Sequence, residues 1–326
     1  MSQKLENMPV EASSSLDGQS GITAAVIATT PPPPPPASKS TAKKKEKQKP
    51  QEKPVKTSEL TAPPPPAPAP VVRAIRWPYG VGEKVTWVLR YGVIEGGVAT
   101  LSVEPPMVLD GEPVIHYKGL VKSSKLLEFF YKINNEINTY VRVKDHLPLR
   151  QEIQQNESGR WGRRVVIFDQ NKNQAKFFQD LTKSDGGKDD ALREDPMTPF
   201  AQDIFGSIYF FRFLDSTRRV SFPIHDRYRN WANELTYLGD EKIRTPAGEF
   251  DTHHFKMFPR VSGSITPKGD VEIWTRKDDS NLILKFTAKI KVGSLTGEVT
   301  SIEPGTPLSF PPPELKTPTD VVNSGT

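Results

Sequence analysis

The chain of 326 residues contains no cysteine and no long apolar run. The missing thiols exclude disulfide bonds, thiolate metal ligands and a thiol nucleophile. The most apolar stretch near the start, residues 21–30, is shorter than the roughly 18 residues of a membrane helix, and it lacks a basic flank. We therefore expect neither a membrane span nor an ordinary signal peptide in the chain as given, so a membrane tether would require an anchor upstream of it.

Aromatic residues are absent before Trp77, although the chain has 5 Trp, 8 Tyr and 16 Phe. Residues 1–72 also hold 15 of the 32 prolines, including the runs at 31–36 and 63–66. A segment with so little to bury cannot form a core, and proline runs favour an extended conformation. The sequence predicts a disordered Pro/Lys-rich arm over residues 1–72 that acts as a semi-rigid spacer, followed by one β-rich domain over 73–302.

The chain has little excess charge outside that arm. Residues 1–72 carry nine Lys against six acidic side chains, and the remainder carries 35 basic against 33 acidic side chains. Such a balance gives the domain no broad basic surface for phosphate binding. The basic run at 43–49 is interrupted by glutamate and glutamine and sits among prolines, which favours a solvated spacer. We expect no nucleic-acid partner.

Alternating apolar and polar residues dominate the chain after Glu83. Val85, Trp87 and Leu89 fall on one face of a strand, with polar residues largely on the other. Further candidate strands cover 97–103, 112–122, 132–143, 149–156, 161–168, 175–179, 219–222, 233–239, 241–245, 250–258, 271–276, 282–290 and 294–302. Short polar loops join neighbours, which indicates antiparallel pairing. The pattern predicts a mainly β fold: a single antiparallel, strongly curved sheet or partly closed barrel of about a dozen strands.

One segment has helical periodicity instead. Phe200, Ile204, Ile208 and Phe211 recur at spacings of four, four and three, which predicts one covering helix over about 198–214. Asp195 or Thr198 could cap it, and Pro199 suits its first turn. Further aromatic residues cover its other sides, so the helix is either core on both sides or a lid over an apolar cavity. In the second case these four residues are the candidate ligand-binding residues.

The segments around these elements are polar. The stretch at 183–196 is rich in Asp, Lys and Gly and predicts a loop before the helix. The stretch from Glu303 to the end contains three consecutive prolines at 311–313, which predicts an unstructured tail over 303–326.

Polar clusters give no pattern typical of catalysis. His253 and His254 are adjacent on a candidate strand, so their side chains point to opposite faces and cannot hold one metal ion together. The acidic cluster at 189–195 lacks the spacing of a calcium loop. Asp278 and Asp279 occupy an evident turn, where carboxylates satisfy backbone donors. We expect no catalytic residue, no metal and no cofactor.

Four segments together resemble a known family. They are Tyr-Gly-Val-Ile-Glu-Gly-Gly-Val-Ala-Thr-Leu at 91–101, Asp-Ile-Phe-Gly-Ser-Ile-Tyr-Phe-Phe-Arg at 203–212, Gly-Asp-Glu-Lys-Ile-Arg-Thr-Pro-Ala-Gly-Glu-Phe at 239–250 and Ile-Trp-Thr-Arg-Lys-Asp-Asp at 273–279. In this order they resemble signatures of the bacterial domain-of-unknown-function family 3108. The resemblance implies an exported, β-rich protein of the Gram-negative envelope with no assigned activity, catalytic residue or ligand residue. The arm looks like the periplasmic spacer of TonB.

Structural roles explain the glycines of these segments. Gly92, Gly96 and Gly97 permit a tight or bulged hairpin, and Gly248 permits a turn with positive φ.

Two functional hypotheses follow. The first is a non-enzymatic periplasmic envelope protein that binds an apolar ligand, a lipid or acyl chain, in a β cavity bordered by the helix. The alternative is a scaffold or assembly protein that binds another envelope protein through its curved sheet, with the helix as plain core. An enclosed apolar cavity would favour the first hypothesis, and a filled interior would favour the second.

Overall fold

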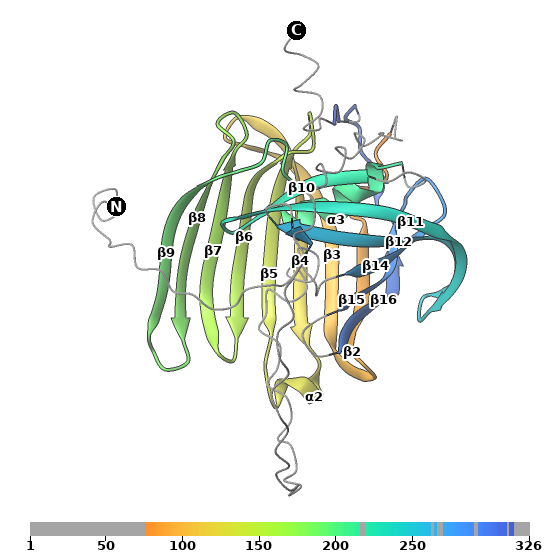
Figure 1. The fold of residues 1–326 in the computed structure, drawn as a ribbon, viewed down its shortest axis with the longest axis horizontal. Helices are drawn as coiled ribbons and strands as arrows, with labels where there is room; N and C mark the ends of the chain where they lie inside the picture. The colour runs from red at the N-terminus through yellow and green to blue at the C-terminus, as the bar shows by residue number, and fades with distance from the viewer. Residues whose placement is uncertain are drawn as a thin grey trace, which may run out of the picture.

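The structure is a computed structural model of residues 1–326, and it describes residues 76–215, 220–261, 264–265, 270–289, 293–311 and 313–315. The predicted arm at 1–72 lies outside these residues. Within them, the main sheet is antiparallel and follows one path in the order β10-β11-β12-β14-β15-β16-β2-β3-β4-β5-β6-β7-β8-β9, with β13 beside β12, and β1 and β17 form a separate two-stranded sheet. Figure 1 shows this sheet spanning the whole domain.

Strands from the first half of the domain form one side of the sheet. They are β2 (Lys84–Tyr91), β3 (Ile94–Leu109), β4 (Glu112–Ser123), β5 (Asn134–Arg142), β6 (Pro148–Glu157), β7 (Arg160–Asp169), β8 (Gln174–Lys183) and β9 (Lys188–Pro196). A four-residue helix, α2 (Lys125–Glu128), lies between β4 and β5. Each of these strands pairs with the next one in the chain, as expected where short turns connect them.

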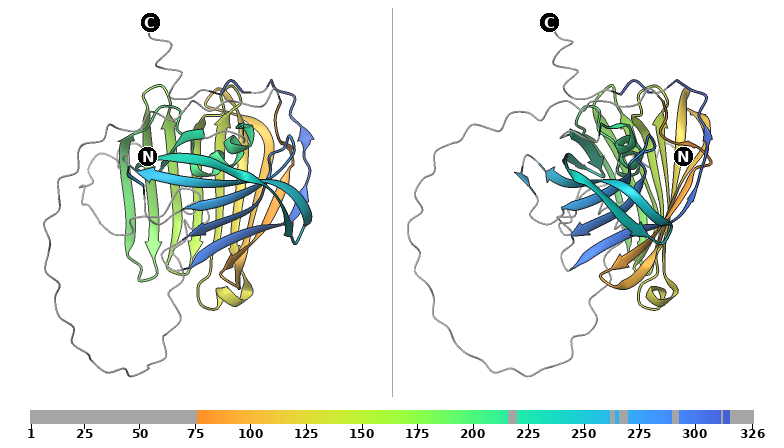
Figure 2. Two further views of the ribbon diagram at one scale, coloured as in Figure 1. Left: turned by 45° about the vertical axis from the view of Figure 1, so that its right-hand side comes forward. Right: turned by 90° about the vertical axis from the view of Figure 1, so that its right-hand side faces the viewer.

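The second half adds strands to the other side of β2. They are β10 (Val220–Asp226), β11 (Arg229–Thr245), β12 (Gly248–Val261), β13 (Ser264–Ile265), β14 (Val271–Arg276), β15 (Ile283–Lys289) and β16 (Ser294–Glu303). The pairing of β16 with β2 joins the two halves. Figures 1 and 2 show β10, β11 and β12 crossing over the face of β3, β4 and β5, while β9 lies at the far edge. The predicted single antiparallel, strongly curved sheet is therefore confirmed, and the sheet is not closed.

Glycine positions set two of the turns as predicted. Gly92 has a φ of 57° in the two-residue turn between β2 and β3, and Gly248 has a φ of 134° at the start of β12. The β2–β3 register shifts so that Gly96 is the extra residue between Gly97 and Glu95, which makes a bulge. The hairpin between β3 and β4 turns through Asp110 and Gly111, both with positive φ, an Asp-Gly pair typical of tight hairpins.

A short helix lies in the bend of the sheet. It consists of α3 (Ile204–Phe210), followed by a turn of 3₁₀ helix, η2 (Phe211–Phe213). The helix contacts β4 and β5 on one side and β10 on the other. Gly119 of β4 makes room for it, because a Cβ there would lie 3.1 Å from Cε1 of Phe205. The main hydrophobic core therefore surrounds the helix between the two halves of the sheet.

The predicted start of the helix and the predicted loop at 183–196 were both wrong. The helix begins at Ile204 with Asp203 as its N-cap, rather than near 198 with Asp195 or Thr198, because the buried Asp203 carboxylate accepts the free helix N–H groups. The segment predicted as a loop at 183–196 contains the edge strand β9, whose charged side chains are typical of edges.

The predicted tail also begins with ordered residues. Strand β17 (Thr306–Pro307) pairs with β1 (Gly80–Val81). The indole Nε1 of Trp77 donates to the carbonyls of Phe310 and Pro311 at 3.0 and 3.1 Å. The described residues up to Leu315 therefore pack on the domain instead of leaving it at Glu303.

Candidate functional site

The four residues proposed to bind an apolar ligand do not all share one helical face. Ile204 and Phe211 are buried, and Ile208 is half-buried and packs on the main core. Phe200 precedes the helix with a φ of 60°, so it does not continue the helical series. The ring of Phe211 meets Phe255 of β12 edge to face, with centroids 5.6 Å apart. The structure brings three of the four residues together, and it places them against core side chains.

Asp203 fixes the start of the helix to the sheet. Its Oδ1 accepts hydrogen bonds from the backbone N–H groups of Phe205 and Gly206 at 2.9 and 3.0 Å. The same oxygen accepts from Thr139 Oγ1 of β5 at 3.1 Å and from Gln151 Nε2 of β6 at 2.7 Å. Burial raises the pKa of Asp203 to about 6, because its effect outweighs that of the hydrogen bonds, which lower the pKa. This carboxylate therefore anchors α3 on two strands.

Aromatic rings and a histidine fill the interior beside the helix. Tyr209 stacks on Tyr117 with centroids 3.8 Å apart, and Tyr117 Oη lies 2.7 Å from Nε2 of the fully buried His146. Burial lowers the pKa of His146 to about 3, so its ring is neutral near pH 7. Phe213 packs edge to face on His146 at 5.2 Å. These side chains are at most 2% exposed, so they are packing partners in the folded state rather than a surface open to a substrate.

A buried ion pair extends this interior. Arg212 of η2 donates to Glu83 Oε1 at 2.5 Å and to Glu83 Oε2 at 3.0 Å. Its guanidinium also donates to the carbonyls of Pro78 and Ser280 at 2.7 and 2.8 Å. All these acceptors come from chain segments far from the helix in sequence, so Arg212 joins the start of the domain, η2 and the β14–β15 turn. A fully hydrogen-bonded arginine is the form in which a buried charge is tolerated.

Two of the polar clusters named from the sequence lie close together, because Asp240 pairs with both His253 and Lys277, the residue before Asp278. His253 Nδ1 lies 2.5 Å from Asp240 Oδ1, whereas His254 Nδ1 lies 2.9 Å from Glu241 Oε1, so the two rings have different partners. Asp278 caps the β14–β15 turn by accepting from the backbone N–H of Ser280 at 2.9 Å. Among the described residues, no group of three or more His, Asp or Glu side chains could hold a metal ion.

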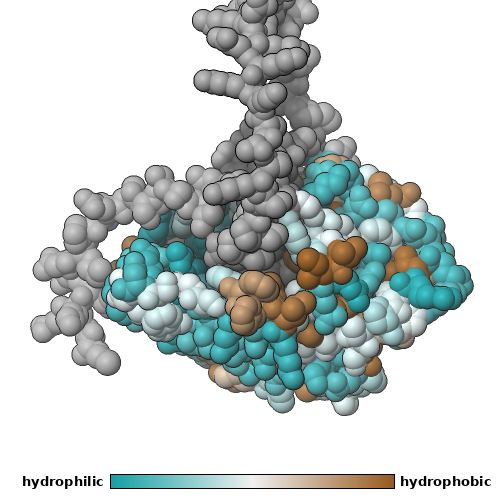
Figure 3. Space-filling view, turned by 90° about the horizontal axis from the view of Figure 1, so that it is seen from below, coloured by the Kyte–Doolittle hydropathy of each residue, from teal (hydrophilic) through white to brown (hydrophobic). Residues whose placement is uncertain are grey.

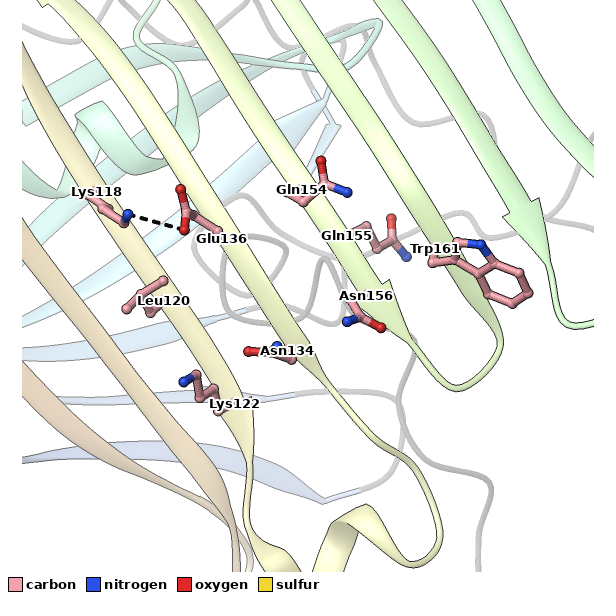
Figure 4. Close-up of a pocket in the computed structure, with 9 residues that line it drawn as sticks. All are labelled: Lys118, Leu120, Lys122, Asn134, Glu136, Gln154, Gln155, Asn156 and Trp161. Atoms are coloured by element: carbon pink, nitrogen blue, oxygen red, sulfur yellow. Dashed lines mark ion pairs between the residues drawn. The ribbon is translucent and has the colours of Figure 1, made fainter.

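A pocket lies on the outer face of the sheet. Its volume is about 550 Å³, and it is lined by Lys118, Leu120, Lys122, Asn134, Glu136, Gln154, Gln155, Asn156 and Trp161. Figure 4 shows these residues along β4, β5, β6 and β7. Phe205 of α3 packs on Gly119, between Lys118 and Leu120, and side chains alternate along a strand. The pocket therefore faces away from the helix and the core.

The chemistry of this pocket is mixed. Lys118 Nζ pairs with Glu136 Oε2 at 3.1 Å, and a hydrogen bond from Asn138 together with Lys118 lowers the pKa of Glu136. Trp161 is 45% exposed beside Asn156, its partner across β6 and β7. Lys122 is exposed and forms no ion pair within the part of the chain that the structure describes. Within the described ranges, the pocket thus offers the unpaired cation of Lys122, several amide groups that donate and accept, and an aromatic surface.

Sequence reasoning missed this pocket because it followed apolar residues. The signal was present in the alternation itself, since the polar positions of the strands at 112–122 and 132–143 fall on one face.

Comparison with solved structures finds matches of low sequence identity. A "Beta-barrel-like Protein of Domain of Unknown Function DUF1849" from Brucella abortus is 7% identical with a TM-score of 0.44. A protein from Parabacteroides distasonis described as a "putative lipoprotein" is 11% identical, and a "putative exported protein with YmcC-like fold" from Bacteroides fragilis is 9% identical, both with TM-scores of 0.31. Each likeness covers 71% of this chain and 100% of the other.

Comparison with curated proteins finds no match. No helix among the described residues is long and apolar enough to cross a membrane. Residues 85–300 match a family described as "Protein of unknown function (DUF3108)", as the four sequence segments predicted. The chain belongs to this family of unknown function.

Proposed function

We propose that this chain is a non-enzymatic protein of the bacterial cell envelope that acts as a scaffold, binding a partner protein on the outer face of its curved sheet. The observation that carries this proposal is the filled interior at α3. Phe211 is 3% exposed and Phe213 is fully buried, so the helix face that would border a cavity is occupied by core side chains. The envelope location rests on the family resemblance alone.

The outer pocket has the chemistry of a protein-binding site. Exposed tryptophan is enriched among the residues that dominate protein interfaces. Asn134, Gln154 and Asn156 can pair with the main-chain groups of an extended segment, and Lys122 can receive a carboxylate. The partner that fits is a polypeptide segment with an apolar side chain for Trp161 and an acidic side chain for Lys122.

One feature of the helix still supports the alternative hypothesis, that the domain binds an apolar ligand. Ile208 is only half-buried, so part of the helix surface stays open to a molecule at the edge of the core. This hypothesis stays a prediction. It differs from the scaffold hypothesis because a bound fatty acid or lipid would have to displace the core side chains packed around α3.

Photo-crosslinking in the native bacterium tests the scaffold. A photoreactive amino acid at Asn156 should give a discrete adduct, and the substitution Trp161→Ala should remove it. The matched control places the same amino acid at Glu249, which is exposed on β12. No adduct from Asn156, or an adduct that survives Trp161→Ala and also forms from Glu249, would contradict binding at the pocket.

A further inference from the structure

Two loops meet at one end of the sheet. The turn between β2 and β3 lies beside the segment that carries α2, because Ser124 N donates to the Gly96 carbonyl and Ser124 Oγ donates to the Glu95 carbonyl, both at 2.9 Å. Ser124 also caps α2 by accepting from Leu127 N. Figures 1 and 2 show α2 projecting beyond the ends of the neighbouring strands. The two loops are thus held together by one backbone and one side-chain hydrogen bond of Ser124, in a protruding arrangement.

These loops expose an unusual set of apolar side chains. The apolar tip, as we call it, consists of Val93, Ile94, Leu126, Phe129 and Phe130. Val93 is 96% exposed and Phe129 is 86% exposed, and the rings of Phe129 and Phe130 meet edge to face at 5.3 Å. Figure 3 shows hydrophobic side chains gathered on this end of the molecule. Single exposed apolar residues are ordinary, but a contiguous group marks an interaction site.

Lysines flank the tip without forming ion pairs. Lys122, Lys125 and Lys132 are exposed, and in the described ranges none of them has an ion-pair partner. Elsewhere on the same sheet, Lys84 and Lys118 pair with carboxylates at 3.0 and 3.1 Å. The exposed Glu95 and Glu128 are the acidic side chains of the two loops, so the surroundings of the tip carry a small excess of positive charge.

We infer that the apolar tip inserts into the surface of a lipid bilayer that contains anionic phospholipids. Phenylalanine and leucine side chains partition into the boundary between headgroups and acyl chains, and adjacent lysines reach the phosphates. Each lysine near an anionic surface strengthens binding by about fivefold.

A second copy of the chain fits the tip less well. A stable dimer buries about 800 Å² on each partner, which is more than a projecting group of five side chains can supply. A symmetric contact would also bring the lysines of one copy against those of the other, whereas anionic headgroups complement them.

The absence of cysteine from the chain allows a test specific to position. Full-length protein with the single substitution Phe129→Cys, labelled with an environment-sensitive nitrobenzoxadiazole dye, is mixed with vesicles of phosphatidylglycerol and phosphatidylethanolamine. We expect the emission to rise and shift to the blue, as for a dye that leaves water. The matched control is Val108→Cys, because Val108 is 66% exposed at the opposite end of β3 and should show no change.

Charge variants and a change of lipid distinguish insertion of the apolar tip from electrostatic attraction of the whole chain to anionic vesicles. The basic run at 43–49 can attract the whole chain to anionic vesicles, but it cannot place the dye at one position and not at another. Lys125→Gln with Lys132→Gln, in the labelled protein, should weaken vesicle binding by about tenfold or more. Vesicles of phosphatidylcholine alone should bind more weakly.

Three outcomes would overturn the inference. The dye at position 129 could stay in water while vesicles bind, the two labelled positions could respond equally, or the dye could respond without vesicles as the protein concentration rises. The last result would identify a second copy as the occupant, and analytical ultracentrifugation would show the dimer. Circular dichroism of each variant would confirm that the exposed substitutions leave the fold intact.

Discussion

Asp203 gives the sharpest test of how the helix is held in the bend of the sheet. Its Oδ1 accepts four hydrogen bonds, two from the helix backbone and one each from Thr139 and Gln151. Its Oδ2 has no hydrogen-bond partner in the described part of the chain. Asp203→Ala removes all four bonds, whereas Asp203→Asn keeps an oxygen where Oδ1 lies and replaces the unpartnered atom with an amide nitrogen.

The two substitutions should differ greatly in the free energy of unfolding. Loss of an N-cap costs about 1–2 kcal/mol, and each of the two buried side-chain donors left unpaired costs about 1–3 kcal/mol. Asp203→Ala should therefore destabilise the protein by about 3–8 kcal/mol. Asp203→Asn should lie within about 1 kcal/mol of the wild type at high pH, because the new unpaired N–H group is offset by the removal of a buried charge.

The pH dependence has a definite sign. The folded pKa of about 6 lies above the unfolded value of 3.8, so folding favours the protonated carboxyl. The stability that Asp203 contributes is fully present below the unfolded pKa and is lost as the pH rises through 6. Between about pH 5 and pH 8 the wild type should lose roughly 1–2 kcal/mol relative to Asp203→Asn. His146 acts in the opposite direction, because its lowered pKa makes protonation destabilising below 6.5.

Urea unfolding of the wild type and both variants at about pH 5 and pH 8 measures these differences. Both variants keep His146, so its contribution cancels in the comparison with the wild type. A difference between wild type and Asp203→Asn that is the same at both pH values would refute the raised pKa. Equal destabilisation by Asn and Ala would refute the role of Oδ1 as the shared acceptor.

Three further predictions concern the interior and the location. Arg212→Ala should cost about 3–5 kcal/mol in urea unfolding because it leaves Glu83 charged, buried and unpaired, and Glu83→Gln in the same protein should recover part of that loss. Gly119→Ala should cost about 1–3 kcal/mol because its Cβ crowds Phe205, while Phe205→Leu in that background should cost less than it does alone. Fractionation of the native bacterium should place the protein in the envelope, and recovery from the cytoplasm alone would contradict that location.

The alternation of apolar and polar residues along the chain made most strands of the sheet predictable. The strand predicted at 112–122 matches β4, and the nine-residue alternation from Leu282 contains β15, because each buries one face and exposes the other. The strand β9 was missed because an edge strand exposes both faces and so lacks the alternation. The helix start was missed because Phe200 fits the helical spacing, although its backbone is left-handed.

The candidate site was harder to predict than the fold. A pocket depends on which residues of four strands share a face and a level, and strand register is not fixed by the sequence of one strand. Trp161 meets Asn156 only through the β6–β7 register, and Lys122 meets Asn134 only through the β4–β5 register. The apolar tip was likewise invisible from one segment, since Val93 and Phe129 come from separate loops.

The most direct test of a filled interior uses Phe211. Its ring packs on Phe255, so Phe211→Ala should cost about 3–5 kcal/mol in urea unfolding if the helix face is core. The same two proteins are titrated with a fluorescent fatty acid. The scaffold hypothesis predicts this large loss of stability and no saturable binding by the wild type. Saturable binding by the wild type that disappears in a variant of nearly unchanged stability would contradict it and would identify the domain as a carrier of an apolar ligand.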